Sequence, residues 1–76
     1  MREFLEFIAR RLVDQPDMVV IDHEEKESRV VFTLKVAPPD VGKIIGRKGR
    51  TAQALRVLLS AVAAKEGKRV ILEIAD

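Results

Sequence analysis

The sequence contains no cysteine, no tryptophan and no tyrosine, and its single histidine is His23. Without cysteine the chain can form neither a disulfide framework nor a thiolate metal site, and one histidine cannot supply a metal cluster. We therefore expect no metal, no cofactor and a reducing, cytoplasmic environment. The three phenylalanines lie far along the chain from the central glycines. Aromatic platforms that stack nucleic-acid bases are thus not expected.

Groups suited to catalysis or to membrane insertion are also scarce. Two acids, Glu3 and Glu6, lie near the N-terminus, and no long apolar run follows, so neither a signal peptide nor a membrane span is predicted. Ser28 and Ser60 have no nearby base to activate them, and His23 is most simply a surface strand residue. We predict no enzymatic activity and no small-molecule substrate. A chain of 76 residues has room for one domain with a modest core.

Positive charge is concentrated in the middle of the chain. Residues 41–65 contain six Lys or Arg and no acid, whereas residues 1–40 contain six Lys or Arg and nine acids. The net charge of the whole chain is only +2. This asymmetry predicts one positive face on an otherwise acidic body, as in proteins that bind a polyanion at one site.

Two glycines bracket two cations at the centre of this basic segment, in the order Gly46-Arg47-Lys48-Gly49. Glycine permits positive φ angles and close approach of a ligand to the backbone. A helical pattern follows, so the amide N–H groups and the positive dipole end of that helix are available to an anion. The segment therefore predicts a turn that holds a phosphate group.

Two other glycine-rich phosphate loops can be excluded by spacing. A nucleotide-binding P-loop has four residues between its glycines, but Gly42 and Gly46 are separated by three, and Arg47 follows. A Rossmann fingerprint needs glycine at the position of Ile44. The remaining alternative is that Gly46 and Gly49 only end one helix and begin another.

Periodicity predicts the elements on either side of this turn. A helix over 2–14 is expected to bury Phe4, Leu5, Ile8 and Leu12. Strands are predicted over 18–24, 30–36 and 68–75, with a hairpin turn at 25–28. Asp40 is expected to cap a short helix over 41–45, and Gly67 to end a helix over 50–66. That longer helix is expected to bury Leu55, Leu58, Leu59 and Val62.

These elements predict an α+β fold in the order α-β-β-α-α-β. The hairpin makes the first two strands antiparallel, and a right-handed crossover makes the second and third parallel. Helices are then expected to cover one face of a three-stranded mixed sheet.

The segment Val41-Gly42-Lys43-Ile44-Ile45-Gly46-Arg47-Lys48-Gly49-Arg50-Thr51 resembles the signature of KH domains, whose G-x-x-G loop clamps about four nucleotides of single-stranded RNA. With its length and element order, the chain is similar to the small single-KH proteins of bacteria, the KhpA family. The resemblance implies one type II KH domain over residues 1–76, with the G-x-x-G loop at 46–49. It also implies a role as RNA chaperone or post-transcriptional regulator, together with a larger KH partner of the Jag/KhpB type. The RNA-binding residues that it predicts are Gly42, Lys43, Ile44, Ile45, Gly46, Arg47, Lys48, Gly49 and Arg50.

The long helix carries a second apolar stripe, which consists of Ala54, Val57, Ala61 and Ala64. With this stripe the helix has more apolar surface than is needed to cover one thin sheet. The stripe therefore predicts a homodimer or a heterodimer with another KH protein. Two classes of function follow. The first is a single-stranded RNA-binding module, and the second is a protein-interaction adaptor that uses the long helix and binds nucleic acid only incidentally.

Overall fold

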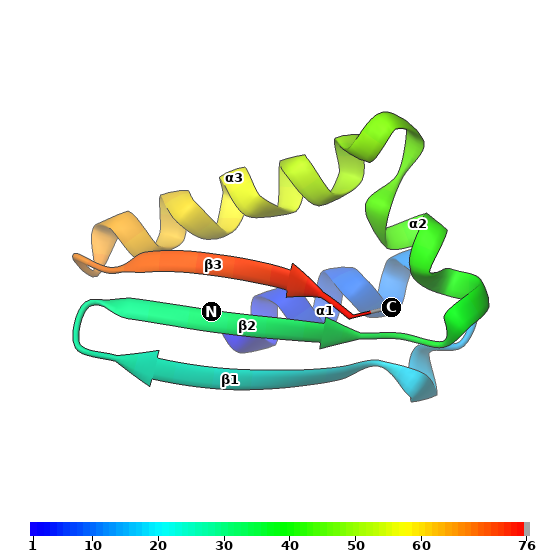
Figure 1. Ribbon diagram of the computed structural model, residues 1–76, viewed down its shortest axis with the longest axis horizontal. Helices are drawn as coiled ribbons and strands as arrows, with labels where there is room; N and C mark the ends of the chain where they lie inside the picture. The colour runs from blue at the N-terminus through cyan, green and yellow to red at the C-terminus, as the bar shows by residue number, and fades with distance from the viewer. Residues whose placement is uncertain (76) are drawn as a thin grey trace.

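A computed structural model describes residues 1–75 of the chain, and residue 76 of the predicted domain lies outside the described residues. The elements follow the predicted order (Figure 1): α1 (Arg2–Leu12), β1 (Val20–Lys26), β2 (Arg29–Lys35), α2 (Val41–Ile45), α3 (Arg50–Lys65) and β3 (Arg69–Ile74). Three short 3₁₀ turns lie between them, at Pro16–Met18, Pro38–Asp40 and Arg47–Gly49. The first strand begins and ends two residues later than expected, and α1 ends two residues earlier than expected.

The strands form one sheet in the order β1-β2-β3. β1 and β2 pair antiparallel and β2 and β3 pair parallel, as predicted from the hairpin and the crossover. Figure 1 shows α1 and α3 on one side of the sheet, while the other face is open. The predicted α+β fold, a mixed three-stranded sheet covered on one face, is confirmed.

The core lies between the helices and the covered face of the sheet. Its sheet side is an alternating set on β1 and β2, Ile21, Val30, Phe32 and Leu34, together with Leu72 on β3. The helices contribute residues at intervals of three or four: Leu5 and Ala9 on α1, Ile44 on α2, and Ala52, Leu55, Leu59 and Ala63 on α3.

Three of the large side chains expected in the core are exposed: Phe4, Leu12 and Leu58. Small residues, Ala9 on α1 and Ala63 on α3, occupy fully buried positions instead. The residues expected in the core of both helices were all large apolar side chains, and no alanine was among them. An alanine lets a helix backbone approach the sheet closely, so the alanines decide which way each helix is rotated and turn Leu58 outward.

The two predicted helix caps had different outcomes. Gly67 ends α3 with φ +69°, and the N–H of Lys68 donates to the carbonyl of Ala63 at 2.9 Å, as in a Schellman motif. The predicted capping of α2 by Asp40 was wrong. Asp40 has helical backbone angles, not the extended ones that a capping residue adopts, and its buried carboxylate accepts a hydrogen bond from the N–H of Gln15 at 3.0 Å. This bond ties the start of α2 to the α1–β1 connection.

Candidate nucleic-acid interface

Three of the four residues in the turn between α2 and α3 have positive φ angles. Gly46, Lys48 and Gly49 have φ angles of +76°, +57° and +74°. The N–H of Gly46 donates to the carbonyl of Gly42 at 2.8 Å, and the N–H of Gly49 donates to that of Gly46 at 3.1 Å. The turn thus joins α2 to α3 within four residues and presents the exposed Arg47 and Lys48 at its tip.

The two glycines of the turn serve different physical needs. A Cβ on Gly46 would lie 2.8 Å from the backbone nitrogen of Thr51, so packing inside the turn leaves no room for a side chain. A Cβ on Gly49 would meet nothing within 4 Å, so only its positive φ favours glycine there. Gly42 lies in α2 with open space around it, which leaves its backbone approachable by a ligand.

Three cations surround the tip of the turn, and all are exposed: Arg47, Lys48 and Arg50. Within residues 1–75 none of them forms an ion pair. The turn also stands at the N-terminus of α3, a helix of 16 residues, where the helix dipole places partial positive charge. Side chains, dipole and backbone amides therefore favour an anion at the same place.

Lys43 has a different environment from these three cations. Its ammonium forms a hydrogen-bonded ion pair with the carboxylate of Asp14, at the end of α1. This hydrogen bond raises the pKa of Lys43 above its ordinary value of 10.5. Lys43 therefore links α2 to the segment after α1, and its charge is partly neutralised.

The two isoleucines of α2 point in opposite directions. Ile44 is fully buried in the core, whereas the side chain of Ile45 is on the surface, with 38% of the residue exposed. Leu55, on the facing side of α3, is buried as well. Of the two isoleucines, Ile45 is thus the one accessible to a ligand, and Ile44 belongs to the core.

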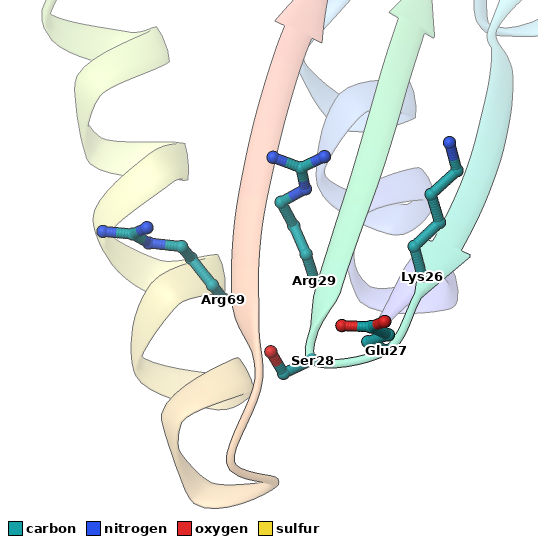
Figure 2. A pocket seen from close by; sticks show the side chains of 5 residues that line it. All are labelled: Lys26, Glu27, Ser28, Arg29 and Arg69. Carbon is teal, nitrogen blue, oxygen red and sulfur yellow. The ribbon is translucent and has the colours of Figure 1, made fainter.

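Several residues of this surface had not been predicted to contribute. Thr51 fills the space next to Gly46, and Arg56 reaches from α3 to the edge of the sheet, where it donates to the carbonyl of Leu72 at 3.3 Å. The sequence signals neither contact, because each depends on how α3 lies relative to another segment. At the other end of α3, Arg29 and Arg69 are paired residues on the adjacent strands β2 and β3, and their side chains extend in different directions (Figure 2).

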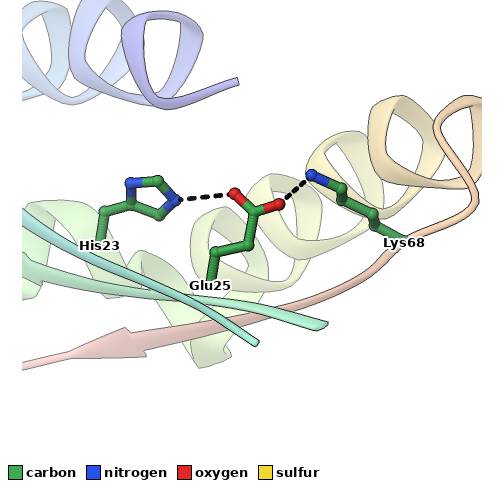
Figure 3. A network of polar contacts seen from close by, with 3 residues as sticks. All are labelled: His23, Glu25 and Lys68. Carbon is green, nitrogen blue, oxygen red and sulfur yellow. Dashed lines mark hydrogen bonds and ion pairs between the residues drawn. The ribbon is translucent and has the colours of Figure 1, made fainter. Parts of the chain in front are cut away.

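His23 belongs to a small polar network near the hairpin (Figure 3). Its Nε2 lies 3.6 Å from Oε1 of Glu25, whose other oxygen accepts a hydrogen bond from Lys68. The hydrogen bond from Lys68 lowers the pKa of Glu25 below its ordinary value of 4.5. The His23 ring stacks on Phe32 with centroids 5.3 Å apart. The prediction that His23 is a surface strand residue is confirmed.

In residues 1–75, no cluster of three or more His, Asp or Glu side chains is placed to hold a metal ion. Over the same residues, each helix is too short or too polar to cross a membrane.

Comparison with known proteins identifies the family. The model of the family described as "KhpA/KhpB, KH domain" matches residues 2–74. Relatives named "RNA-binding protein KhpA" include those of Clostridium acetobutylicum, 49% identical, and Caldanaerobacter subterraneus subsp. tengcongensis, 50% identical, each over 97% of this chain and 99% of the relative. A third relative of that name, from Borreliella burgdorferi, is 51% identical over 97% of this chain and 90% of its own length. The family is not one of enzymes, in agreement with the prediction. Because the match covers nearly all of this chain and of these relatives, and the fold has the element order implied by the resemblance, the chain belongs to the KhpA/KhpB family of KH domains.

Proposed function

We propose that this chain is a cytoplasmic single-stranded RNA-binding protein, in which residues 1–76 act as one KH unit with a phosphate clamp at 46–49. The observation that carries the proposal is the turn itself. Its positive-φ backbone holds Arg47 and Lys48, which form no ion pair with any of residues 1–75, at the N-terminus of α3. The relatives named as RNA-binding proteins support the same function.

In this proposal each part of the turn has a role. RNA phosphates lie against the backbone of Gly46–Gly49, and the side chains of Arg47, Lys48 and Arg50 supply formal charge. Gly42 allows the RNA to approach α2, and Ile45 supports a base. Ile44 and Lys43 contribute indirectly, the first by packing beneath the turn and the second by fixing α2 to Asp14.

A site of this kind binds weakly and with modest selectivity. It covers about four nucleotides, and it has no aromatic side chain on which bases can stack. Such properties suit an RNA chaperone or a post-transcriptional regulator that contacts many RNAs briefly. Useful affinity then requires a second KH module, because joining two sites raises the effective concentration of the second.

The exposed face of α3 supplies a surface for that second module. The predicted second apolar stripe is on the surface. Within it Val57 is 59% exposed, and Leu58 beside it is 46% exposed. We propose that this face mediates a homodimer or a heterodimer with a larger KH protein of the Jag/KhpB type. The family description, which names KhpB beside KhpA, supports a partner of that kind.

A binding titration tests the RNA-binding function. The chain is titrated with a single-stranded RNA and with an uncharged analogue of the same sequence, at several salt concentrations. We expect binding of the RNA alone, weakening as salt rises, because each phosphate contact displaces counterions. Equal binding of both oligomers, or none of either, would contradict the proposal.

The same apolar face of α3 favours a second candidate, the protein-interaction adaptor. In that case α3 binds a protein partner and the turn contributes nothing measurable to function. Loss of partner binding on substitution of Val57 or Leu58, together with no salt-dependent RNA binding, would favour the adaptor.

A further inference from the structure

A second cluster of cations lies at the other end of α3 from the glycine turn. Lys26, Arg29 and Arg69 stand side by side on β1, β2 and β3, because Lys26 pairs with Arg29 and Arg29 with Arg69 in the sheet register. We call these three residues the cation row. A helix of 16 residues, about 24 Å long, separates it from the turn.

The cation row faces the open side of the sheet. Val30 and Val70, the neighbours of Arg29 and Arg69, pack on the core, so the arginines must point the other way. Figure 2 shows Arg29 extending along the strands and Arg69 extending toward α3. Together with Glu27 and Ser28, the row lines a hollow of about 680 Å³.

The two arginines of the row are adjacent like charges without a partner. Both are exposed, and within residues 1–75 neither forms an ion pair, while Lys26 lies 3.4 Å from Glu24. Like charges directly opposite in a sheet destabilise it. Anions bound to these arginines would reduce that repulsion, and each guanidinium group is well shaped to hold a phosphate with two hydrogen bonds.

The surroundings of the row point to RNA as its ligand. α3 has no acidic residue, and Arg56 stands between the turn and the row, bound to the β3 edge at Leu72. The open sheet face beyond the row instead carries Asp22, Glu24 and Glu73, as its register shows. A polyanion that leaves the turn is therefore attracted along the seam between α3 and β3 and repelled from the middle of the open face.

We propose that the cation row is a second phosphate-binding site, at which Arg29 and Arg69 hold the backbone of an RNA that extends from the glycine turn along the α3–β3 seam. This inference rests on the proposed RNA-binding function. It adds that the chain contacts RNA beyond the four or so nucleotides of the clamp, and that it does so through arginines on the sheet.

The test compares two RNA lengths with the Arg29→Gln/Arg69→Gln variant. An oligouridylate of about four nucleotides fills only the clamp, whereas one of about 16 nucleotides can also reach the row. We expect the variant to bind the short RNA as the wild type does. For the long RNA we expect the log–log salt slope to be flatter by about 1.4, because two phosphate contacts are lost.

The matched control is Arg10→Gln/Lys35→Gln, which removes the same charge from cations already paired with Glu6 and Asp22. Its slope for the long RNA should remain that of the wild type. If the chain forms a dimer, a long RNA can also reach the glycine turn of the second subunit. Both variants retain that turn, so this contribution to the salt slope is the same in each. The arginine variant should melt at the wild-type temperature or higher, since it loses a like-charge pair.

The outcomes distinguish this inference from the function on which it rests. If the wild type binds neither RNA, the proposed function fails. If the wild type binds both RNAs and the arginine variant keeps the wild-type slope for the long one, the second site is refuted. If the arginine variant keeps that slope but no longer binds a polyglutamate peptide that the wild type binds, the second phosphate-binding site is refuted as well. The row would then be a docking site for an acidic protein segment.

Discussion

The most direct test of the glycine turn reverses its two charges, with Arg47→Asp and Lys48→Asp in one variant. Both glycines remain, and both altered residues are exposed, so each change should alter the free energy of unfolding by only about 0.5 kcal/mol. Lys48 has a φ angle of +57°, a region in which aspartate is among the better tolerated residues. The variant should therefore fold normally, and its RNA affinity then reports on contacts and not on stability.

The expected loss of affinity can be worked from the contacts. An exposed charge pair contributes at most about 1 kcal/mol, so removing two weakens binding about 30-fold at low salt, before any repulsion by the new carboxylates. With an RNA of about four nucleotides, contacted by Arg47, Lys48 and Arg50, the wild-type log–log slope should be about 2.1, and that of the variant about 0.7. A rise from about 50 to 200 mM salt then weakens wild-type binding about 18-fold and variant binding about 2.6-fold.

The assay is fluorescence anisotropy with a labelled single-stranded RNA at several salt concentrations, alongside the melting temperature of each protein. The control variant, Arg2→Asp/Lys35→Asp, makes the same change in net charge at exposed positions outside the turn. Its slope should stay near that of the wild type. If the turn variant remains folded and binds with wild-type affinity and slope, the phosphate clamp is refuted and the adaptor becomes the better account of this chain.

Three further predictions follow from the same structure. Gly46→Ala should lower the melting temperature more than Gly49→Ala, because both substitutions incur a positive-φ cost of about 1 kcal/mol but only Gly46 is crowded by its neighbours; equal losses in calorimetry would contradict this. The Lys68→Gln variant should have a higher Glu25 pKa than the wild type, because the hydrogen bond from Lys68 is what lowers the pKa of Glu25. NMR titration of Glu25 measures this change. A lowered carboxyl pKa contributes stability that is present above pH 4.5, the ordinary pKa, and is lost as pH falls through the lowered pKa. The wild type should therefore be more stable than the variant at neutral pH, and the difference should shrink in strong acid. An unchanged Glu25 titration would exclude the interaction. Finally, Ala61→Glu, on the exposed face of α3, should shift sedimentation toward the monomer, and an assembly that is unaffected would place the interface elsewhere.

The local features of this protein were determined by sequence alone. Alternation of apolar residues identified β2 and β3, and the positions of Gly46 and Gly49 located the turn, because these signals depend on neighbouring residues. Gly67 likewise marked the end of α3, since a Schellman motif is completed within six residues. The basic composition of residues 41–65 was sufficient to predict the charge around the turn.

The tertiary structure alone decided which distant residues meet. Asp40 accepts a hydrogen bond from the N–H of Gln15, 25 positions away, and does not cap α2 as its local sequence suggested. Lys43 pairs with Asp14, 29 positions away, a contact that its local sequence does not indicate. The outward rotation of Leu58 depends on how closely the alanines of α3 approach the sheet. The pairing of Arg29 with Arg69 exists only because β2 and β3 are parallel in one particular register. Such contacts depend on the relative placement of whole elements, which no local pattern of residues encodes.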